Sequence, residues 1–476
     1  ITALAETNFR ELTIRLDHAV HEAPVNIRID AGAGLVAIGE KDDAWHYSVI
    51  SLEDGSIVAT GEFPESAIYY DTGDVQGLGI DQLCFLSADG LSALDLASGA
   101  INDIAEIDSI YHGDPVQGPA YLDFVRDIND DGSEFVLTPS FTGWLVATHR
   151  DSGTAHFQLE IPPRVTVYGL GVNYRPRQPQ IGDANGDGLN DVVFLVDREF
   201  ISFQQTAGSR FDTKGRRDGI AAPLATEKQR ARWARDDGQV DQSDLEIEEV
   251  ELVRDFNDDD ILDLLTEKSI SEGVFDRRSE YHLYLGHRDG ESLTYAASPD
   301  GSIASGGVQF EPVVVDVDGD GRMDIATPST KLSLTRVVGA LFSGRMGVDL
   351  DVYRMREDGS YPDESDYQTR FKVEFDLKTG LSRYPAVAIA DFDGDGLSEL
   401  VLQKEKDELT FYPGIGAPKI FGKKTQTLEL ELPRNGQMVK AGDLNDDGRD
   451  DLLVRYGPAD GEDLDHELLV LMSEQD

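Results

Sequence analysis

Cysteine, long apolar runs and basic residues are all scarce in this sequence, and each shortage excludes something. The 476 residues contain a single cysteine, so no disulfide can form within the chain. Cys84 lies in the apolar run Leu83-Cys84-Phe85-Leu86, where we expect it to act as a small buried hydrophobe. No apolar stretch approaches the roughly 18–20 residues that a membrane-spanning helix needs, so we expect no membrane span.

Acidic residues far outnumber basic ones. Asp and Glu total 91 against 42 Lys and Arg, which gives a formal net charge of −49. A chain this acidic should avoid nucleic acids and anionic membranes. The apolar fraction is 40%, which is enough to build a core. The composition therefore predicts a folded protein with a well-solvated surface, or with a surface that meets cations.

One acidic loop is abundant: it is repeated seven times, always just before an apolar run. The loop follows the pattern D-x-[DN]-x-D-G-x-x-[DE], and its copies begin at 74, 127, 183, 255, 316, 391 and 443. Two clean copies are Asp183–Asp191 and Asp316–Asp324. Recurrence at steps of 52 to 75 residues indicates a repeat array, which overrides the several domains that length alone would suggest.

The chemistry of this loop favours Ca²⁺, which takes about six to eight oxygen ligands. Side chains at positions 1, 3, 5 and 9 can converge on one point, position 7 can add a backbone carbonyl, and glycine at position 6 permits the turn. Carboxylates this close repel one another unless a cation lies among them. No ligand is His or Cys, which disfavours zinc, and Mg²⁺ is the weaker rival because it prefers to keep its waters.

The seven copies differ in completeness, and we predict about five or six Ca²⁺ sites. The loop at 74 lacks ligands at positions 3, 5 and 9, so we expect a turn without metal there. The loop at 127 has Phe135 at position 9 and loses a ligand unless Glu134 substitutes, and the loop at 255 has Asp260 in place of glycine. The predicted ligands are Asp127, Asn129, Asp131; Asp183, Asn185, Asp187, Asp191; Asp255, Asn257, Asp259, Asp263; Asp316, Asp318, Asp320, Asp324; Asp391, Asp393, Asp395, Glu399; and Asp443, Asn445, Asp447, Asp451.

Strand-like segments surround each loop. Around the loop at 127 they are residues 121–126, 135–138, 144–149 and 156–161, which alternate in polarity and are separated by turn residues. Four strands in a unit of roughly 50 residues is the size of a β-propeller blade. We therefore predict an all-β fold, with one β-propeller domain over residues 1–476.

The number of blades follows from the two ends of the chain. Before the first loop, segments 25–30, 35–39, 45–51 and 56–62 already make a blade without an acidic loop. The last blade has only three strands of its own, and the N-terminal segment 9–16 can supply the fourth and remove the open edge. The prediction is eight blades of four antiparallel strands closed by the N-terminal strand, with seven blades as the alternative.

Two of the intervals between successive acidic loops are longer than the rest, and they predict helical or hairpin insertions at about 205–244 and 329–383. The first includes a short helix near 226–236 and a cluster of basic residues, the basic island. We expect the island to pack on the protein's own acidic rim. Alternatively, it binds an anionic partner or glycan, with Trp233 as a stacking surface. In the second, a helix near 334–342 precedes strands 348–355 and 370–377, which form an elaborated blade or a docking element. The basic island comprises Lys214, Arg216, Arg217, Lys228, Arg230, Arg232 and Arg235.

The repeated acidic loop followed by a strand resembles the FG-GAP/VCBS repeats of integrin-alpha-like, calcium-binding β-propellers. The resemblance extends over nearly the whole chain through the seven loops. It implies a propeller with Ca²⁺ in the turn between the first two strands of a blade, and it carries metal ligation to the positions above. The family's Phe-Gly and Gly-Ala-Pro signatures are not clearly present, because Gly416-Ala417-Pro418 lies away from the expected place. Integrin-type ligand recognition is therefore not implied.

The sequence favours a non-catalytic, calcium-stabilised scaffold that binds a protein or an extracellular glycan, because a site repeated in every blade suits a structural role. The alternative is a polysaccharide lyase-like enzyme with a calcium-assisted site at the propeller channel. Nothing in the sequence pairs its candidate groups, and we assign no catalytic residue and no organic cofactor. A third reading, a glycan-binding module, finds sparse support in three tryptophans. The lyase candidates are His112, Tyr168, Tyr174, Arg175 and Arg177.

Calcium also bears on where the protein works. Extracellular calcium, at about millimolar concentration, would fill such loops, whereas cytosolic calcium would leave most of them empty. The chain starts at Ile1 without an initiator Met, as a processed form would. We therefore expect an exported protein, extracellular or periplasmic, in which calcium takes the place of disulfides as the crosslink. The sequence does not specify an oligomeric state.

Overall fold

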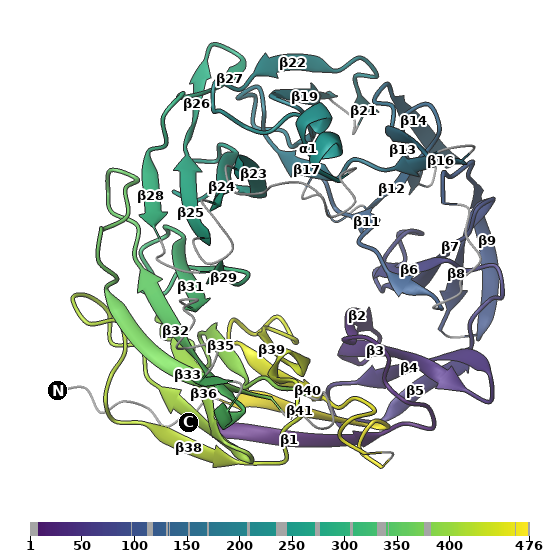
Figure 1. The fold of residues 1–476 in the computed structure, drawn as a ribbon. Coiled ribbons are helices and arrows are strands. Elements are labelled where there is room, and N and C mark those ends of the chain that lie inside the picture. The colour runs from purple at the N-terminus through teal and green to yellow at the C-terminus, as the bar shows by residue number, and fades with distance from the viewer. Residues whose placement is uncertain are drawn as a thin grey trace.

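Eight short antiparallel sheets follow one another around a ring, and together they form a β-propeller (Figure 1). In the first seven blades the chain starts near the middle of the ring and moves outward strand by strand, whereas the outermost strand of the eighth blade comes from the N-terminal segment (Figure 1). This arrangement confirms the prediction of eight blades, and the seven-bladed alternative is wrong. In this computed structural model the described residues are 8–96, 98–111, 118–129, 132, 134–150, 153–168, 171–206, 210–234, 245–271, 277–304, 308–330, 339–340, 342–375, 382–461 and 463–474.

The first four blades cover the N-terminal half of the chain. In blade two, a short fifth strand, β10 (Ala120–Tyr121), adds in parallel to the innermost strand. The strands are β2 (Val25–Ile29), β3 (Gly32–Lys41), β4 (Ala44–Ser51) and β5 (Ile57–Glu62); β6 (Tyr69–Gly73), β7 (Gln82–Leu86), β8 (Gly90–Asp95) and β9 (Ala100–Glu106); β11 (Val125–Arg126), β12 (Phe135–Pro139), β13 (Trp144–Arg150) and β14 (Gly153–Leu159); β17 (Pro179–Gly182), β18 (Asp191–Val196), β19 (Glu199–Phe203) and β22 (Arg216–Gly219).

The other four blades complete the ring. In blade six, β29 (Val308–Gln309) pairs with the second strand and β34 (Ser382–Arg383) pairs with the outermost strand. The strands are β23 (Leu245–Arg254), β24 (Asp263–Ser271), β25 (Arg277–Tyr284) and β28 (Gly301–Ala304); β30 (Val313–Val315), β31 (Asp324–Thr330), β32 (Arg345–Tyr353) and β33 (Tyr367–Phe375); β35 (Val387–Ala390), β36 (Glu399–Glu405), β37 (Glu408–Tyr412) and β38 (Gln426–Glu429); β39 (Val439–Gly442), β40 (Asp451–Arg455), β41 (Glu467–Glu474) and β1 (Asn8–Arg15).

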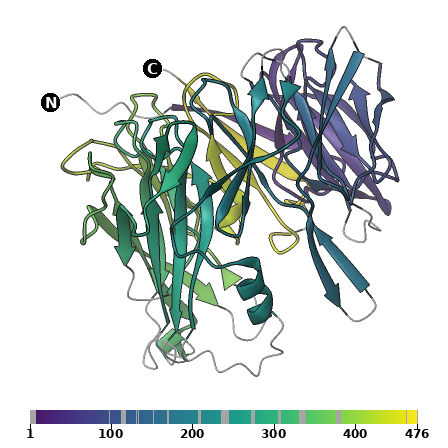
Figure 2. The same cartoon turned by 90° about the horizontal axis from the view of Figure 1, so that it is seen from above.

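The N-terminal strand closes the ring, as the sequence predicts. β1 pairs antiparallel with β41 along its whole length, from Asn8 opposite Glu474 to Arg15 opposite Glu467. The last blade is thereby completed by the first strand of the chain. Figure 2 views the ring from above. Among the described residues, no helix has the length and apolar character of a membrane span.

Apolar side chains pack between neighbouring blades. Eight buried clusters occur among the described residues, and each draws its members from two adjacent blades. Phe135 and Phe194 belong to the cluster between blades three and four, and Leu35 and Leu468 to the one that joins blade one to blade eight. Because every blade buries both of its faces, the clusters hold the ring together by burying apolar surface.

The segment predicted as a first insertion, about 205–244, contains both extra elements and part of a blade. Its extra elements are the hairpin β20 (Gln205–Thr206) with β21 (Arg210–Phe211) and the predicted helix, α1 (Glu227–Ala234). The same segment also supplies β22, the outermost strand of blade four. Two further hairpins lie elsewhere: β15 (Arg164–Tyr168) with β16 (Gly171–Arg175), and β26 (Gly286–Asp289) with β27 (Ser292–Tyr295). A short 3₁₀ turn, η2 (Gly436–Met438), precedes blade eight.

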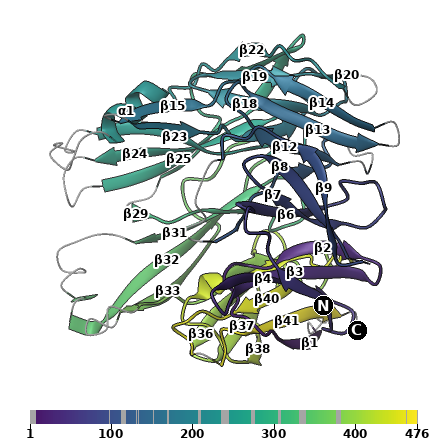
Figure 3. The ribbon, with the colours of Figure 1, turned by 90° about the vertical axis from the view of Figure 1, so that its right-hand side faces the viewer.

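The segment predicted as a second insertion, about 329–383, supplies the two outer strands of blade six. These are β32 and β33, each of 9 residues, which project well past the shorter strands of the blade (Figure 3). The long interval in the sequence also reflects the connections between strands, because β31 ends at Thr330 and β32 begins at Arg345, and β32 ends at Tyr353 and β33 begins at Tyr367. The predicted helix near 334–342 falls largely on residues 331–338 and 341, outside the described part of the chain.

Candidate metal sites

The acidic loops share one turn geometry. In all seven copies the second carboxylate oxygen of the position-1 aspartate accepts the backbone N–H of position 6, at 2.6 to 2.9 Å. In the loop at 316, Asp316 Oδ1 also accepts from Gly319 N at 2.8 Å. Position 6 has positive φ, at +84° for Gly321 and +58° for Asp260, so aspartate takes the place of glycine in the loop at 255 as expected. A single carboxylate therefore organises the turn.

The position-9 carboxylate lies at the base of the loop and is buried. Asp324 is 1% exposed, and its two oxygens accept from Val317 N at 3.0 Å and from Met355 N at 2.8 Å. The first bond fixes the start of the loop, and the second ties it to the end of β32, the third strand of the blade. The same pair of bonds recurs at Asp191, Asp263, Glu399 and Asp451.

Burial makes these carboxylates hard to ionise. It raises the pKa of Asp191, Asp263 and Asp324 to about 7 and that of Glu399 to about 8, against the opposing effect of the backbone N–H bonds. The nearby aspartates of each loop raise the pKa further, because they are like charges. A cation among these carboxylates would remove that cost, since it favours the charged form.

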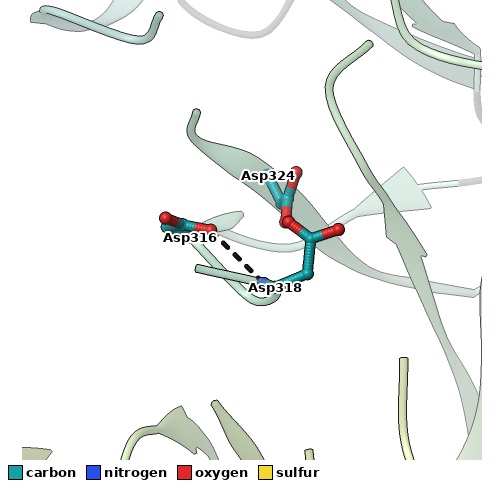
Figure 4. A group of neighbouring side chains, drawn as sticks. All are labelled: Asp316, Asp318 and Asp324. Carbon is teal, nitrogen blue, oxygen red and sulfur yellow. Dashed lines mark hydrogen bonds between the residues drawn. The ribbon is translucent and has the colours of Figure 1, made fainter. Parts of the chain in front are cut away.

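Two loops bring three carboxylates together at metal-ligand spacing. The oxygens of Asp316, Asp318 and Asp324 lie within 4.8 Å of one another (Figure 4), and so do those of Asp391, Asp393 and Asp395. The two sets use different positions of the motif: 1, 3 and 9 in the first, and 1, 3 and 5 in the second. Position 5 of the first set, Asp320, instead pairs with the guanidinium of Arg322, two residues away.

The other three well-formed loops have asparagine at position 3. Its amide nitrogen donates to the position-5 aspartate, at 3.0 Å in the loops at 183 and 255 and at 3.2 Å in the loop at 443. These bonds hold Asn185, Asn257 and Asn445 beside Asp187, Asp259 and Asp447. The side chains at positions 3 and 5 are thus adjacent in all three, with an amide in place of one carboxylate.

The environment of Asp318 suits a bound Ca²⁺. The Asp318 side chain is 8% exposed, and although its Oδ2 accepts from Arg354 Nη1 at 2.7 Å, its buried Oδ1 has no hydrogen-bond partner among the described residues. A buried carboxylate oxygen without a partner is costly, because it has lost water and gained nothing. Since two further carboxylates lie beside it, an oxygen-seeking cation satisfies it best.

Position 8 has a role that the motif did not suggest. In three loops its backbone N–H donates to a carbonyl at position 1 or 2 of the loop in the preceding blade, and some side chains at this position reinforce the link. Ser398 Oγ donates to Asp316 O at 3.1 Å, and Asp450 Oδ2 accepts from Asp391 N at 2.7 Å. The backbone bonds run from Met323 to Phe256 at 2.8 Å, from Ser398 to Val317 at 3.2 Å and from Asp450 to Asp391 at 2.7 Å. The residue types at position 8 vary too much to have marked this role in the sequence.

Glu134, at position 8 of the loop at 127, also faces the preceding blade and does not complete its own loop. A Cβ added to Gly73, in that blade, would lie 2.0 Å from Glu134 Oε2. Burial raises the pKa of Glu134 to about 8, and Asp81 and Asp74 of that neighbouring loop raise it further. In its own loop, Asp127 accepts from Asn129 N at 3.3 Å, and Asp131 lies outside the described residues.

Of the groups considered for catalysis, Arg177 and Tyr174 have described contacts, and neither contact involves an acidic loop. Arg177 is buried and is bound to Glu227 of α1 and to Pro162 O, so its role is to hold the helix. Tyr174 is 40% exposed on β16 and contacts Phe141 ring to ring. His112 lies outside the described residues. The described contacts therefore assign Arg177 to packing and leave Tyr174 on the surface.

The basic island packs in part against the protein's own acids. Arg216 pairs with Glu291 at 3.3 Å, and Arg217 pairs with Glu199 at 2.8 Å. Arg230 lies 3.8 Å from a carboxylate oxygen of Glu249. These three pairs match the first of the two readings of the island. The side chains of Arg232 and Trp233, and all of Arg235, lie outside the described part of the chain.

Part of the chain matches a known protein family. Residues 391–454 match the family model of the FG-GAP-like repeat, and no curated protein matches the chain. Similar solved structures include an Agrocybe aegerita lectin described as recognising non-reducing terminal N-acetylglucosamine (14% identity, 88% of this chain, 94% of that chain, TM-score 0.41). Another is the Dos1 propeller (8% identity, 97% of this chain, 95% of that chain, TM-score 0.44). The chain is an eight-bladed β-propeller that carries an FG-GAP-like repeat across blade seven and the start of blade eight.

Proposed function

We propose that this protein is an exported, calcium-stabilised propeller that serves as a binding scaffold for a protein or a glycan. The loops at 183, 255, 316, 391 and 443 would each hold one Ca²⁺ through positions 1, 3, 5 and 9. The observation that carries the proposal is the buried oxygen of Asp318, which has no partner among the described residues and lies beside Asp316 and Asp324. Bound calcium would supply positive charge that cancels the repulsion within each loop.

A structural role for the ion is supported by where the loops lie. Each loop that we assign to Ca²⁺ connects the first two strands of its blade, and its position-9 carboxylate accepts a backbone N–H at or just past the end of the third strand. In the loops at 316, 391 and 443, position 8 also binds the preceding blade. An ion held there would therefore fasten parts of two blades. If free calcium exceeds Kd about a thousandfold, each site adds about 4 kcal/mol to the free energy of unfolding.

The calcium concentration that such loops need supports an exported location, extracellular or periplasmic. Loops of this kind are filled at about millimolar calcium and would be mostly empty at cytosolic levels. The partner would bind at the loops around one end of the ring, since propellers place their variable loops there. A site repeated in several blades suits a structural role, so we propose binding without catalysis.

Calcium binding is tested by titration of chelator-treated protein with Ca²⁺ in a calorimeter, with the bound metal counted by equilibrium dialysis. We expect about five ions per chain and much weaker binding of Mg²⁺. The double variant D316N/D318N should bind one ion fewer. The matched control is D54N/D103N, which removes the same charge from two exposed aspartates outside the loops and should bind the full number. A chain that binds no Ca²⁺, or a D316N/D318N variant that binds the full number, would overturn the proposal.

A further inference from the structure

A cavity of about 750 Å³ lies between blades six and seven. Its walls come from β32, β33 and β34 on one side and from β36 and β37 on the other. Blade seven contributes the far end of β36, near Lys404, whereas the acidic loop at 391 joins the near end, at Glu399. The cavity is therefore separate from the candidate metal sites.

The charge of this cavity is opposite to that of the protein. Of the described residues only two acidic ones, Glu374 and Glu405, line it, on a chain with 91 acidic and 42 basic residues. Six basic residues line it, namely Arg345, Arg370, Lys372, Arg383, Lys404 and Lys406. The cavity is therefore a region of positive electrostatic potential, whereas the rest of the surface is acidic and repels anions.

Two of the six cations are already neutralised within the protein. Arg345 pairs with Glu374 at 2.8 Å, and Arg370 pairs with Asp349 at 2.5 Å. The other four have no carboxylate partner among the described residues. One of them, Arg383, has a buried Nη1 without a hydrogen-bond acceptor in the described part of the chain. A guanidinium nitrogen left in this state favours an incoming anionic oxygen, because Arg donors bind carboxylates and sulfates well.

Aromatic rings complete the lining. Phe371 and Tyr412 are both half-buried at the cavity, and Lys404 Nζ lies 4.9 Å from the centroid of the Tyr412 ring. A volume in this range suits a small ligand of several rings. The aromatic rings also offer flat apolar surface, which an inorganic ion cannot use.

We propose that this cavity binds an acidic saccharide, a short oligosaccharide that bears carboxylate or sulfate groups. Its anionic groups would contact Lys372, Arg383 and Lys404, and a sugar face would stack on Tyr412. The proposal specifies a ligand for the proposed scaffold, and it rests on the proposed function only because the folded ring must present a binding site. The ligand chemistry differs from that of the loops, which take a cation.

The test uses the full chain in saturating Ca²⁺, after calcium loading has been measured separately. Trigalacturonate, a heparin-derived tetrasaccharide, neutral maltotriose, inorganic sulfate and a tetraglutamate peptide are titrated in turn by calorimetry. We expect the carboxylated or the sulfated saccharide to bind, maltotriose and sulfate to bind about tenfold more weakly or worse, and affinity to fall as NaCl is raised. Because the heparin fragment bears sulfates in addition to carboxylates, tighter binding of it than of trigalacturonate would show that sulfate groups contribute.

Variants locate the site. K372Q/K404Q and R383Q should each lower the affinity for the better saccharide about tenfold or more, because each removes a charge-assisted contact. The matched control is K423Q/K424Q, which removes the same charge from exposed residues of blade seven that do not line the cavity. Unchanged melting temperatures in Ca²⁺ show that the variants fold.

Three results would overturn the inference: no saccharide binding by a calcium-loaded chain, equal loss in the K423Q/K424Q control, or tighter binding of tetraglutamate than of either acidic saccharide. Since calcium loading is measured first, a chain that takes up calcium but no saccharide contradicts only this inference. A chain that takes up no calcium contradicts the proposed function instead.

Discussion

The loop at 74 and the loop at 316 make the same turn with different chemistry. Asp74 accepts two N–H groups of its own loop at 2.6 and 2.7 Å, much as Asp316 does at 2.8 Å. At position 9, however, the first loop has Gln82 and the second has Asp324, both buried. The Gln82 amide donates to Ile80 O at 2.6 Å and accepts from Gln76 N at 3.2 Å, so this loop is closed by hydrogen bonds alone.

This difference separates two roles that the motif combines. The position-1 aspartate and the positive φ at position 6 make the turn in every copy, including the loop at 74, which lacks the further carboxylates. Convergence of negative charge is an additional property, which needs carboxylates at positions 3, 5 and 9. We therefore expect the loop at 74 to ignore calcium and the loop at 316 to depend on it.

Calcium removal should produce the largest effect. With several sites at about 4 kcal/mol each, a chelator should lower the melting temperature by tens of degrees or unfold the chain. Differential scanning calorimetry in Ca²⁺ and in chelator measures this. The variant D74N should lose the same small amount of stability in both buffers, whereas D316N should lose more in Ca²⁺. If D316N lost the same amount of stability in the two buffers, the loop at 316 would not differ from the loop at 74 in its dependence on calcium.

Removal of the buried carboxylate at position 9 should come next. D324A leaves Val317 N and Met355 N without an acceptor, so we expect a loss of about 2–4 kcal/mol even in chelator. Urea denaturation of the two proteins gives the difference. A variant as stable as the parent in chelator would show that this carboxylate serves the ion alone. Q82A is the matched change in the loop at 74.

A pH effect is expected beside the loop at 74. Asp71 is 3% exposed, and burial raises its pKa to about 7, with a further contribution from Asp123. Because the folded pKa lies above the unfolded one, the stabilising protonated form is lost as the pH rises through about 7. We expect about 1.4 kcal/mol less stability from this group at pH 8 than at pH 6. The difference in urea midpoint between the two pH values, in constant Ca²⁺, should be smaller in D71N, and an equal difference would contradict this assignment.

The smallest effect concerns the link between blades. S398A removes the bond from the hydroxyl to Asp316 O but keeps the backbone bond to Val317 O. We expect a loss of about 0.5–1.5 kcal/mol and slightly weaker Ca²⁺ binding at the loop at 316. Urea denaturation and calcium titration measure the two quantities. S365A, which removes an intrablade hydroxyl bond to Asp351, is the control and should leave calcium affinity unchanged.

Much of the fold could be predicted because the acidic loop marks the same point in seven of the eight blades. Strand order and the closing role of residues 9–16 followed from counting strands at the two ends. The outer strands of blade six were harder to recognise as part of the blade, because the long interval before the next loop made 329–383 resemble an insertion. Around the loops, the motif named the positions but not the position-8 contacts, because Met323, Ser398 and Asp450 have no residue type in common. Glu134 shows the same limit: only the packing of neighbouring blades decides which loop it faces.

The pairing of β1 with β41 has a consequence for synthesis. The first strand leaves the ribosome long before its partner, since β1 ends at Arg15 and β41 begins at Glu467. Until then the other three strands of blade eight are missing, so β1 has no partner and blade one has no neighbour on one side. The growing chain must therefore protect an unpaired, partly apolar strand, and closure is a late step that joins segments far apart in the sequence. Permuted chains that begin at Val25 and carry β1 after β41 would remove that delay while keeping every blade.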